Sequence, residues 1–532
     1  MNGGGQANSV ALEFRRAVTL WGSQPFLEIL PGTAGIYQEQ ARTLGYADAA
    51  AAVDVLVDRY RRAGYGAGHR VGLMLDNRAE FFLHWLALNE CGASVVPLNA
   101  DLRPAELGYL VANSGLVLVV AAGAYLARIQ AVPMAAIAPD ALPPPAPAGA
   151  GASGECAVLY TSGTTGKPKG CILSNDYFIR AGAWYIASGG LSAILPGRDR
   201  LITPLPMTHM NAMAYSTMAM LMSGGCIIPL DRFHPRSWWD SVRESRATIV
   251  HYLGVMPSML LGAPPAADDA VHHVRFGFGA GIDPGDHGRF EARFGFPLLE
   301  AWAMTETGAG AVVIANREPR RVGASLLGVP GPAMELRIVD EGGCDAANGA
   351  AGELLVRAAG CDPRAGFFSG YLHDEAATVE AWEGGWFHTG DVVREEATGD
   401  LVFIDRRKNV IRRSGENISA LEVESVLRRH AAVAAVAVAG TPDAVRGEEV
   451  LACVVLHPGG PVDRVALAAE IVAAARVELS YFKIPGWIAF VEDLPLTVTQ
   501  KVQRGELKAR ARMLPGEPCC IDTRPLKTRS VA

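Results

Sequence analysis

Residues 159–170 read Leu159-Tyr-Thr-Ser-Gly-Thr-Thr-Gly-Lys-Pro-Lys-Gly170 and continue an apolar segment that begins at Ala157, which predicts a buried strand entering a loop. Seven of the last ten residues are threonine, serine or glycine. Glycines let main-chain N–H groups approach a ligand, hydroxyls donate to anionic oxygens, and lysines add positive charge. This composition predicts a phosphate-binding loop. It is not a Walker A loop, because two residues rather than four separate its inner glycines and a proline follows the first lysine.

Helix and strand patterns alternate on the N-terminal side of this loop. Helical periodicity predicts helices at Tyr46–Ala63, 79–91 and 105–113, and short apolar runs predict strands at 70–75, 94–98 and 116–121. Strands separated by helices indicate a parallel sheet with crossover connections. Residues 133–154 are dominated by proline, alanine and glycine and are expected to form a surface connector.

The pattern changes after about residue 320. Short strands expected at 335–339, 353–357 and 401–404 indicate a small β-rich lobe, and helices at 421–430 and 465–479 with strands at 433–438, 450–456 and 487–491 indicate a compact α+β unit. The expected fold class is therefore α/β. A large N-terminal domain, residues 1–405, combines parallel-type sheets, helices and the β-rich lobe. A small, mobile α+β C-terminal domain, residues 406–532, follows it.

Composition narrows the function classes. The chain has 532 residues, of which 50% are hydrophobic and 19% charged, which is typical of a globular protein. A net charge of −7 argues against a nucleic-acid partner. Nine cysteines without a C-x-x-C pair indicate free thiols and a cytoplasmic location. Residues 201–230 are uncharged, but prolines and glycines interrupt them, so a strand, a loop and a buried helix at 212–222 are expected rather than a membrane span.

The loop at 159–170 resembles the signature loop of the AMP-forming adenylating enzymes, a superfamily of acyl-CoA synthetases, adenylation domains and luciferases. Residues 40–510 carry further motifs that resemble the superfamily's, in its order: Ala301-Trp-Ala-Met-Thr-Glu306, Gly385-Trp-Phe-His-Thr-Gly-Asp391, Asp405-Arg-Arg-Lys408, Gly415-Glu-Asn-Ile-Ser419 and Pro495-Leu-Thr-Val-Thr-Gln-Lys501. The segments at 206–209 and 406–419 are most similar to acyl-CoA ligases of the carnitine/crotonobetaine type. The resemblance implies an ATP-dependent acid–CoA ligase that works through an acyl-adenylate and releases AMP and diphosphate.

The chemistry of that reaction explains the residue types. Two anions meet when a carboxylate attacks the α-phosphate of ATP, so catalysis consists mainly of positioning and charge neutralisation. The resemblance implies that Glu306 binds Mg²⁺, that Thr305 contacts the α-phosphate and that Asp391 binds the ribose hydroxyls. Adenine is expected between Trp302 and the turn of Gly279, Ala280 and Gly281. The residues expected to hold the β- and γ-phosphates are Thr161, Ser162, Gly163, Thr164, Thr165, Gly166, Lys167 and Lys169.

The C-terminal motifs carry the remaining assignments for the nucleotide and the thiol. Lys501 is expected to be catalytic in the first step, because an ammonium group bridges the acyl oxygen and the α-phosphate in the transition state. Arg406 is expected to contact the ribose. Lys408 matches the hinge around which the small domain rotates in the family. That rotation would carry Lys501 away and bring Gly415 near the coenzyme A tunnel.

His209 has two interpretations. By resemblance it lies at the junction of the acyl pocket and the thiol tunnel and takes part in catalysis and substrate binding; by its uncharged surroundings it is a hydrogen-bonded core histidine. The expected walls of the acyl pocket are Asn211, His251, Tyr252 and Trp302. No arginine or lysine in those segments suggests a dedicated partner for a second substrate carboxylate, and Arg275 is left open as a candidate.

Several positions depart from the family pattern without removing a charged or ligating group: Ala303, Ser414, Ala420 and Gln500. An active enzyme is therefore expected, with ATP, Mg²⁺ and coenzyme A as cofactors or cosubstrates and a small carboxylic acid as substrate. Two alternatives remain at this point. The acyl group could pass to a carrier protein in trans, or the chain could be a non-catalytic nucleotide-binding protein. No membrane span is expected, and a homodimer is left open.

Overall fold

The computed structural model describes residues 8–527 with the exception of 103, 131–133, 148–153, 162–167, 407–408, 414–415, 444–445, 460–462, 480 and 497–500. Its contacts divide the chain into two compact units. Unit 1 comprises Met1–Leu336, Leu355–His388 and Ala397–Leu401; unit 2 comprises Arg337–Leu354, Thr389–Glu396 and Val402–Ala532. The expected mixed α/β class, with a large N-terminal part and a smaller C-terminal part, is confirmed. The boundary at residue 405 stays a prediction.

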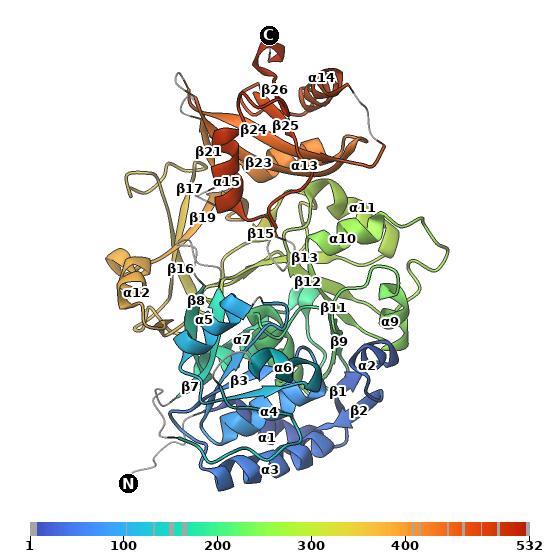
Figure 1. The fold of residues 1–532 in the computed structure, drawn as a ribbon, viewed down its shortest axis with the longest axis vertical. Coiled ribbons are helices and arrows are strands. Elements are labelled where there is room, and N and C mark those ends of the chain that lie inside the picture. The colour runs from blue at the N-terminus through green and yellow to red at the C-terminus, as the bar shows by residue number, and fades with distance from the viewer. Residues whose placement is uncertain are drawn as a thin grey trace. The chain divides into compact units, whose positions relative to one another are not determined.

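One sheet of unit 1 runs in the order β14-β13-β12-β11-β9-β10-β1-β2 (Figure 1). Its inner strands from β13 to β1 are parallel, and β14 and β2 join the two edges antiparallel. Because the inner strands are parallel, their carboxyl ends meet at one edge, where ligands bind in open α/β sheets. The strands are β1 (Pro25–Ile29), β2 (Arg42–Gly45), β9 (Arg200–Thr203), β10 (Cys226–Pro229), β11 (Ile249–Leu253), β12 (Phe276–Ala280), β13 (Leu298–Trp302) and β14 (Val313–Ile314).

The other sheet of unit 1 runs in the order β18-β8-β7-β4-β3-β5-β6. The strands from β7 to β6 are parallel, whereas β8 and β18 are antiparallel to their neighbours. The predicted strands at 70–75, 94–98 and 116–121 are confirmed as β3, β4 and β5. The bounds are β3 (Arg70–Met74), β4 (Ser94–Pro97), β5 (Leu118–Ala121), β6 (Ala136–Ile137), β7 (Glu155–Thr161), β8 (Lys169–Ser174) and β18 (Gly370–Tyr371).

The predicted connector at 133–154 is partly wrong, because β6 lies within it and pairs with β5. Buried histidines hold its backbone in place. Nε2 of His84 lies 3.0 Å from the carbonyl oxygen of Pro139, and Nε2 of His69 lies 2.7 Å from that of Pro147. A proline-rich stretch offers carbonyl acceptors but few N–H donors, so side-chain donors from other elements can fix it.

Buried helices occupy the space between the two sheets of unit 1. Helix α4 (Ala79–Glu90; Figure 1) is buried over most of its length and contacts β3 and β4. Helix α8 (Thr217–Ser223) contacts β10 of the other sheet. Helices α1 (Val10–Trp21), α3 (Tyr46–Ala63) and α7 (Asn175–Ala187) pack against this pair. The predicted helix at Tyr46–Ala63 is confirmed, and Gly64 ends it in the left-handed conformation at φ +88°.

Shorter helices complete unit 1: α2 (Pro31–Tyr37), α5 (Pro104–Ser114), α6 (Gly123–Gln130), α9 (Trp238–Glu244), α10 (Val255–Leu261), α11 (Pro284–Phe294), α12 (Glu375–Ala381), η1 (Gly190–Ser192) and η3 (Glu383–Gly385). Strand β15 (Leu326–Gly328) contacts β13 and β14. In the described ranges, no helix is both long enough and apolar enough to cross a membrane. All nine cysteines are described and are free thiols.

The buried helix expected at 212–222 has an irregular start. A π-helix, η2 (Asn211–Ser216), precedes α8. The hydroxyl of Ser216 donates to the carbonyl oxygen of Asn211, and that of Thr217 donates to the carbonyl oxygen of Ala212, each spanning five residues. These side chains stabilise a wider turn than the α-helix that periodicity predicts. Such turns are frequent at functional sites.

The β-rich segment contains β16 (Met334–Val339), β17 (Ala351–Ala358), β19 (Phe387–Glu395) and β20 (Leu401–Arg406). Strands β16, β17 and β20 confirm the strands expected at 335–339, 353–357 and 401–404. The division between the units runs through this segment.

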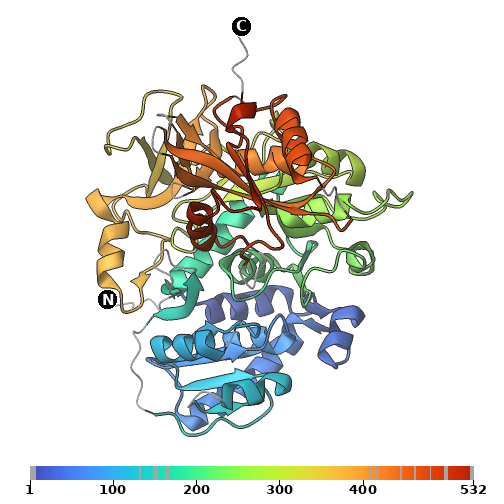
Figure 2. The same cartoon turned by 45° about the horizontal axis from the view of Figure 1, so that its top comes forward.

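The C-terminal part of unit 2 is the expected compact α+β fold (Figure 2). Alternate residues of β23 face opposite sides of its sheet: Val436 and Val438 pack with α13 and α14, whereas Ala437 and Ala439 pack with α15. The elements are α13 (Ala420–Arg428), α14 (Arg464–Ala475), α15 (Arg504–Met513), β21 (Ile411–Arg413), β22 (Glu416–Ile418), β23 (Val433–Asp443), β24 (Gly447–Leu456), β25 (Trp487–Phe490), β26 (Cys520–Asp522) and η4 (Arg524–Leu526).

Candidate active site

The predicted phosphate loop joins β7 to β8, an antiparallel pair in which Thr161 lies opposite Lys169. Both of these residues are half-buried. The pairing brings the two ends of the loop together at one end of the hairpin. The intervening predicted residues, Ser162, Gly163, Thr164, Thr165, Gly166 and Lys167, lie outside the described residues, and their assignment stays a prediction.

Tyr371, which the sequence did not reveal, contacts both Lys169 and Glu306. The Lys169 Nζ atom is 4.8 Å from the ring centre of Tyr371 and 3.6 Å from Oδ2 of Asp374. The Tyr371 hydroxyl donates to Oε1 of Glu306 at 3.0 Å. Burial, together with the charge on Glu306, raises the pKa of Tyr371, so its hydroxyl stays protonated and remains a donor. Local pattern could not identify Tyr371, because 65 residues separate it from Glu306.

The turn that carries Thr305 and Glu306 is held by hydrogen bonds from several elements. The hydroxyl of Thr307 accepts from the Met304 N–H at 2.9 Å, and the hydroxyl of Tyr177 donates to the carbonyl oxygen of Thr305 at 2.9 Å. The main-chain N–H of Phe368 donates to the carbonyl oxygen of Glu306 at 2.9 Å. The Glu306 carboxylate is therefore fixed at a buried position, with 7% of the residue exposed.

The predicted turn at 279–281 comprises the last two residues of β12 and Gly281 just beyond it, at the carboxyl edge of the sheet. Gly281 has φ +74°, and a Cβ atom there would have no neighbour within 4 Å, so the space beside it is open to a ligand. Behind the turn, a Cβ atom on Gly254 would lie 1.6 Å from the carbonyl oxygen of Gly281, so only glycine fits. Trp302, the expected adenine neighbour, ends β13 with 6% of its surface exposed. Ala280 is exposed, and its contact with adenine stays a prediction.

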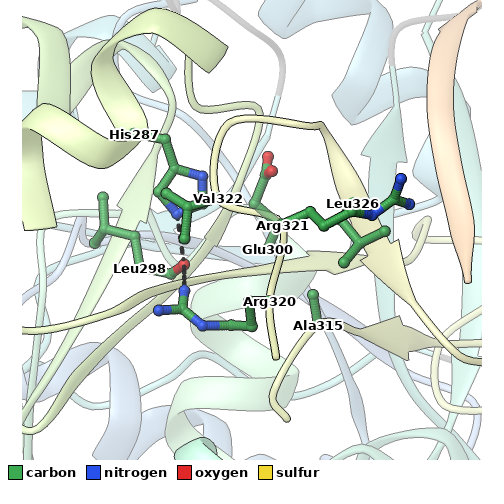
Figure 3. Close-up of a pocket in the computed structure, with 8 residues that line it drawn as sticks. All are labelled: His287, Leu298, Glu300, Ala315, Arg320, Arg321, Val322 and Leu326. Carbon is green, nitrogen blue, oxygen red and sulfur yellow. Dashed lines mark hydrogen bonds between the residues drawn. The ribbon is translucent and has the colours of Figure 1, made fainter. Parts of the chain in front are cut away.

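Glu300 supports this turn and was missed by sequence reasoning. Its Oε1 atom accepts from the Gly281 N–H at 3.2 Å, and burial raises the pKa of its carboxyl group to about 7. Figure 3 shows Glu300 in a small pocket, where His287 and Arg320 both bond to the carbonyl oxygen of Leu298. The sequence signal that could have identified Glu300 is the presence of an acidic residue inside the otherwise apolar strand Leu298–Trp302.

The expected acyl-pocket residues have different surroundings. His209 is exposed, which makes the core-histidine interpretation wrong. Asn211 is half-buried, and its Oδ1 atom lies 2.7 Å from Nδ1 of His251. Tyr252 is 2% exposed and packs its ring against Gly279, so it supports the 279–281 turn in addition to any contact with substrate.

Arg275 cannot serve a second substrate carboxylate while its guanidinium group is engaged as it is here. The Nη2 atom lies 2.8 and 2.7 Å from the two carboxylate oxygens of Asp199, and both terminal nitrogens donate to the carbonyl oxygen of Ala193 at 3.0 Å. Asp199 is 1% exposed, so its buried charge depends on this arginine.

Unit 2 contains the predicted ribose-binding pair. The Nε atom of Arg406 lies 2.7 Å from Oδ1 of Asp391, which is 2% exposed. Lys501 is exposed, yet its surroundings partly desolvate its ammonium group and Arg406 repels it, and both effects lower its pKa. Arg406 therefore acts electrostatically on both Asp391 and Lys501. The predicted hinge Lys408 and the predicted coenzyme A contact Gly415 lie outside the described residues.

The arrangement in unit 1 suits a metal-bound polyphosphate. An ammonium group at Lys169 and a carboxylate at Glu306 flank Tyr371 beside a loop rich in glycine and hydroxyls. In the part of the chain that the structure describes, no group of three or more His, Cys, Asp or Glu residues could hold a metal ion. A single carboxylate suits Mg²⁺ that takes its remaining ligands from phosphate and water.

Comparisons with known proteins identify the family of the chain. The family model described as AMP-binding enzyme matches residues 31–372, and its C-terminal domain model matches residues 422–501. Crotonobetaine/carnitine–CoA ligase of Salmonella typhimurium is 28% identical over 529 residues, which cover 92% of this chain and 99% of that protein. The ligase of the same name from Escherichia coli O45:K1 is 29% identical over 477 residues, covering 84% of this chain and 89% of that protein.

Solved structures show the same fold. ATP-bound MatB from Rhodopseudomonas palustris matches with a TM-score of 0.78 and 25% identity, covering 94% of this chain and 98% of that one. The o-succinylbenzoate CoA synthetase MenE from Bacillus subtilis, in complex with the acyl-adenylate intermediate OSB-AMP, matches with a TM-score of 0.79 and 24% identity, over 93% and 97% of the two chains. Since the family model covers well over half of the sequence, the predicted class of enzyme, an AMP-forming ligase of the acyl-CoA synthetase kind, is confirmed, and the chain belongs to the AMP-binding enzyme family.

Proposed function

We propose that this enzyme is an ATP-dependent acid–CoA ligase. A carboxylate oxygen of the acid attacks the α-phosphorus of ATP, diphosphate leaves, and the acyl-adenylate forms. The sulfur of coenzyme A then attacks the acyl carbon, AMP leaves, and the thiol proton passes to solvent. The relatives and neighbours with printed activities are CoA ligases or synthetases, which supports coenzyme A rather than a carrier protein as the acceptor.

The observation that carries the proposal is the cluster of Lys169, Tyr371 and Glu306. Two motifs that are distant in sequence meet at one tyrosine, so that a cation and a carboxylate lie beside the same glycine- and hydroxyl-rich loop. Lys169 would neutralise phosphate oxygens, and the Tyr371 hydroxyl would keep Glu306 oriented. Mg²⁺, when bound at Glu306 and the phosphates, would neutralise further charge on the leaving diphosphate.

The remaining roles follow the predicted assignments. Thr305 would donate to the α-phosphate from a turn already fixed by Tyr177. Trp302 and the 279–281 turn would receive adenine, and Asp391 with Arg406 would bind the ribose hydroxyls. Lys501 would place its positive charge on the oxygen atoms that become more negative in the first transition state.

The test is an assay of two half-reactions over a panel of short, medium-length, aromatic and betaine-type acids. Acid-dependent exchange of labelled diphosphate into ATP measures adenylation, and AMP release that requires free coenzyme A measures thioester formation. Exchange together with CoA-dependent AMP release supports the proposal. Exchange without any response to coenzyme A would indicate a carrier-protein acceptor. A folded protein that shows no exchange with any acid would refute the ligase activity.

A further inference from the structure

His251 is a buried, neutral imidazole in β11 with a partner on each ring nitrogen. It is 0% exposed, and its ring stacks on Phe278 at 4.8 Å between centres. Nε2 lies 3.0 Å from the Tyr185 hydroxyl, and Nδ1 lies 2.7 Å from Oδ1 of Asn211 and 2.8 Å from Oγ of Ser216. Burial lowers the pKa of His251 to about 3, so the ring carries a single N–H proton at neutral pH.

The partners determine which nitrogen carries that proton. The Tyr185 hydroxyl is completely buried, and among the described residues Nε2 of His251 is the acceptor it reaches, so Nε2 accepts and Nδ1 is protonated. The Ser216 hydroxyl donates its own proton to the main-chain carbonyl oxygen of Asn211 at 3.1 Å. The Nδ1–H group therefore donates to Oγ of Ser216 and to Oδ1 of Asn211.

This hydrogen bonding fixes the orientation of the Asn211 amide. Its oxygen is turned toward His251, so its NH₂ group faces away from the buried network. No acceptor among the described residues pairs with that NH₂ group, and Asn211 is half-exposed, so water or a ligand can reach it. The π-helical turn that begins at Asn211 contacts β9, and Asn211 bonds to His251 of β11; in parallel sheets of this kind, ligands bind beside the carboxyl ends of the strands.

We propose that Asn211, held by His251, is a specificity-determining residue that donates to an uncharged hydrogen-bond acceptor on the acyl chain of the substrate. This inference rests on the proposed acid–CoA ligase function and narrows its substrate to acids that carry a carbonyl, hydroxyl or ether oxygen. A second carboxylate fits less well, because Arg275 is already bonded to Asp199 and Ala193. A purely hydrocarbon chain would displace water from the Asn211 N–H donors without replacing its hydrogen bonds, and sites built to hydrogen-bond a substrate discriminate against analogues that lack the group.

The test uses pairs of acids with the same outline, in which a keto oxygen replaces a methyl group: 4-oxopentanoate with 4-methylpentanoate, and 5-oxohexanoate with 5-methylhexanoate. The readout is the ratio of kcat/KM for the oxo acid to that for its methyl partner. The wild-type enzyme is expected to favour the oxo acid roughly tenfold or more in at least one pair. Asn211→Leu is expected to bring that ratio near one by raising the KM for the oxo acid. A wild-type ratio near one in both pairs, or an unchanged ratio in Asn211→Leu, would overturn the proposal.

Two matched tyrosine variants test the positioning role of His251. Tyr185 and Tyr215 are both buried and both lie against Phe278, but only Tyr185 bonds to His251; the Tyr215 hydroxyl donates to the carbonyl oxygen of Gly308 at 3.0 Å. Each phenylalanine variant loses one buried hydroxyl bond, so similar falls in Tm are expected. Tyr185→Phe releases the constraint on Nε2, and the acid ratio is expected to fall about threefold or more. Tyr215→Phe is expected to keep the wild-type ratio.

Equal ratios in the two tyrosine variants would overturn the role of His251. His251→Asn offers a check on the mechanism, since its amide can again donate near the former Nδ1 position and is expected to retain more of the ratio than His251→Phe. Equal ratios in these two histidine variants would count against the assignment of the proton to Nδ1 of His251. If the wild-type enzyme shows no diphosphate exchange with any acid, both the ligase function and the Asn211 assignment are refuted. If it shows exchange but the acid ratios are near one, only the Asn211 assignment is refuted.

Discussion

Replacing Tyr371 with phenylalanine removes one hydroxyl group and leaves the ring in place. In the wild-type protein this hydroxyl donates to Oε1 of Glu306 at 3.0 Å and helps to orient that carboxylate, on a residue that is 7% exposed. The ring contact with Lys169 at 4.8 Å does not need the hydroxyl and is expected to persist. The variant therefore isolates the orientation of Glu306 from the charge of Lys169.

The expected effect is on the magnesium requirement. A residue that orients a metal ligand typically contributes about 10- to 100-fold to metal affinity. The Cys171 thiol also hydrogen-bonds to the Glu306 carboxylate, and Phe368 holds the main chain of Glu306, so the lower end, about tenfold, is expected on loss of the Tyr371 hydroxyl. The assay is diphosphate exchange at saturating ATP and acid, titrated with Mg²⁺. The half-saturating concentration should rise about tenfold, with a smaller change in the rate at saturating Mg²⁺.

Tyr125→Phe is the matched control. The Tyr125 hydroxyl donates to Oδ2 of Asp76 at 2.5 Å, so this variant also loses a tyrosine–carboxylate hydrogen bond, in a different part of unit 1. Both variants are expected to lose about 1–3 kcal/mol of stability. Only Tyr371→Phe should shift the magnesium titration. A folded Tyr371→Phe enzyme with an unchanged titration, or an equal shift in Tyr125→Phe, would refute the reasoning.

Three further predictions concern single charged groups. Lys501→Ala is expected to abolish diphosphate exchange and to reduce CoA thioester formation from supplied acyl-adenylate by less than ~10-fold, and equal losses would contradict its assigned step. In the wild-type enzyme the pKa of Lys501 is lowered, so exchange should decline with rising pH already below the ordinary lysine value of 10.5. Burial raises the pKa of Glu300 to about 7, so the folded protein keeps a proton that the unfolded chain releases above the ordinary value of 4.5. The unfolding free energy should therefore fall between these pH values by up to ~3 kcal/mol, and Glu300→Gln should flatten that fall in denaturant titrations; an unflattened curve would exclude the effect. Lys527→Met removes a buried ammonium 2.8 Å from Oε1 of Glu449, which keeps its 2.9 Å contact with Arg413, and should destabilise unit 2 by about 1–3 kcal/mol, measured by thermal unfolding; a Tm equal to that of wild type would contradict this.

Regular helices and strands were predicted well where the local pattern was strong. The helix at Tyr46–Ala63 has an apolar stripe and a glycine just beyond its end, and both signals are local. The strands β3, β4 and β5 are short apolar runs between helices and were expected as such. Residues 133–154 were harder, because β6 forms only where other elements supply a paired strand and histidine donors.

The residues of the candidate site also fall into two groups, those predicted from local pattern and those that depend on tertiary contacts. The predictions of a phosphate loop, of Trp302, Thr305 and Glu306, and of the C-terminal Lys501 rest on motif composition and order. Tyr371, Glu300 and the Asn211 orientation do not, because each depends on a partner that the fold supplies from a different element. The engagement of Arg275 by Asp199, across 76 residues, likewise could not be read from either neighbourhood.

The linear chain by itself determined the enzyme family and the alternation of elements, and it predicted the residue types of a polyphosphate site. Glycine, hydroxyl and charge patterns within a few residues carry this information because they limit what backbone and ligand can do together. Tertiary structure alone decided which donors remain available, since a hydrogen bond depends on two atoms reaching about 3 Å apart from distant points of the chain. The hydroxyl group that orients Glu306 and the proton inferred on Nδ1 of His251 both depend on such tertiary contacts.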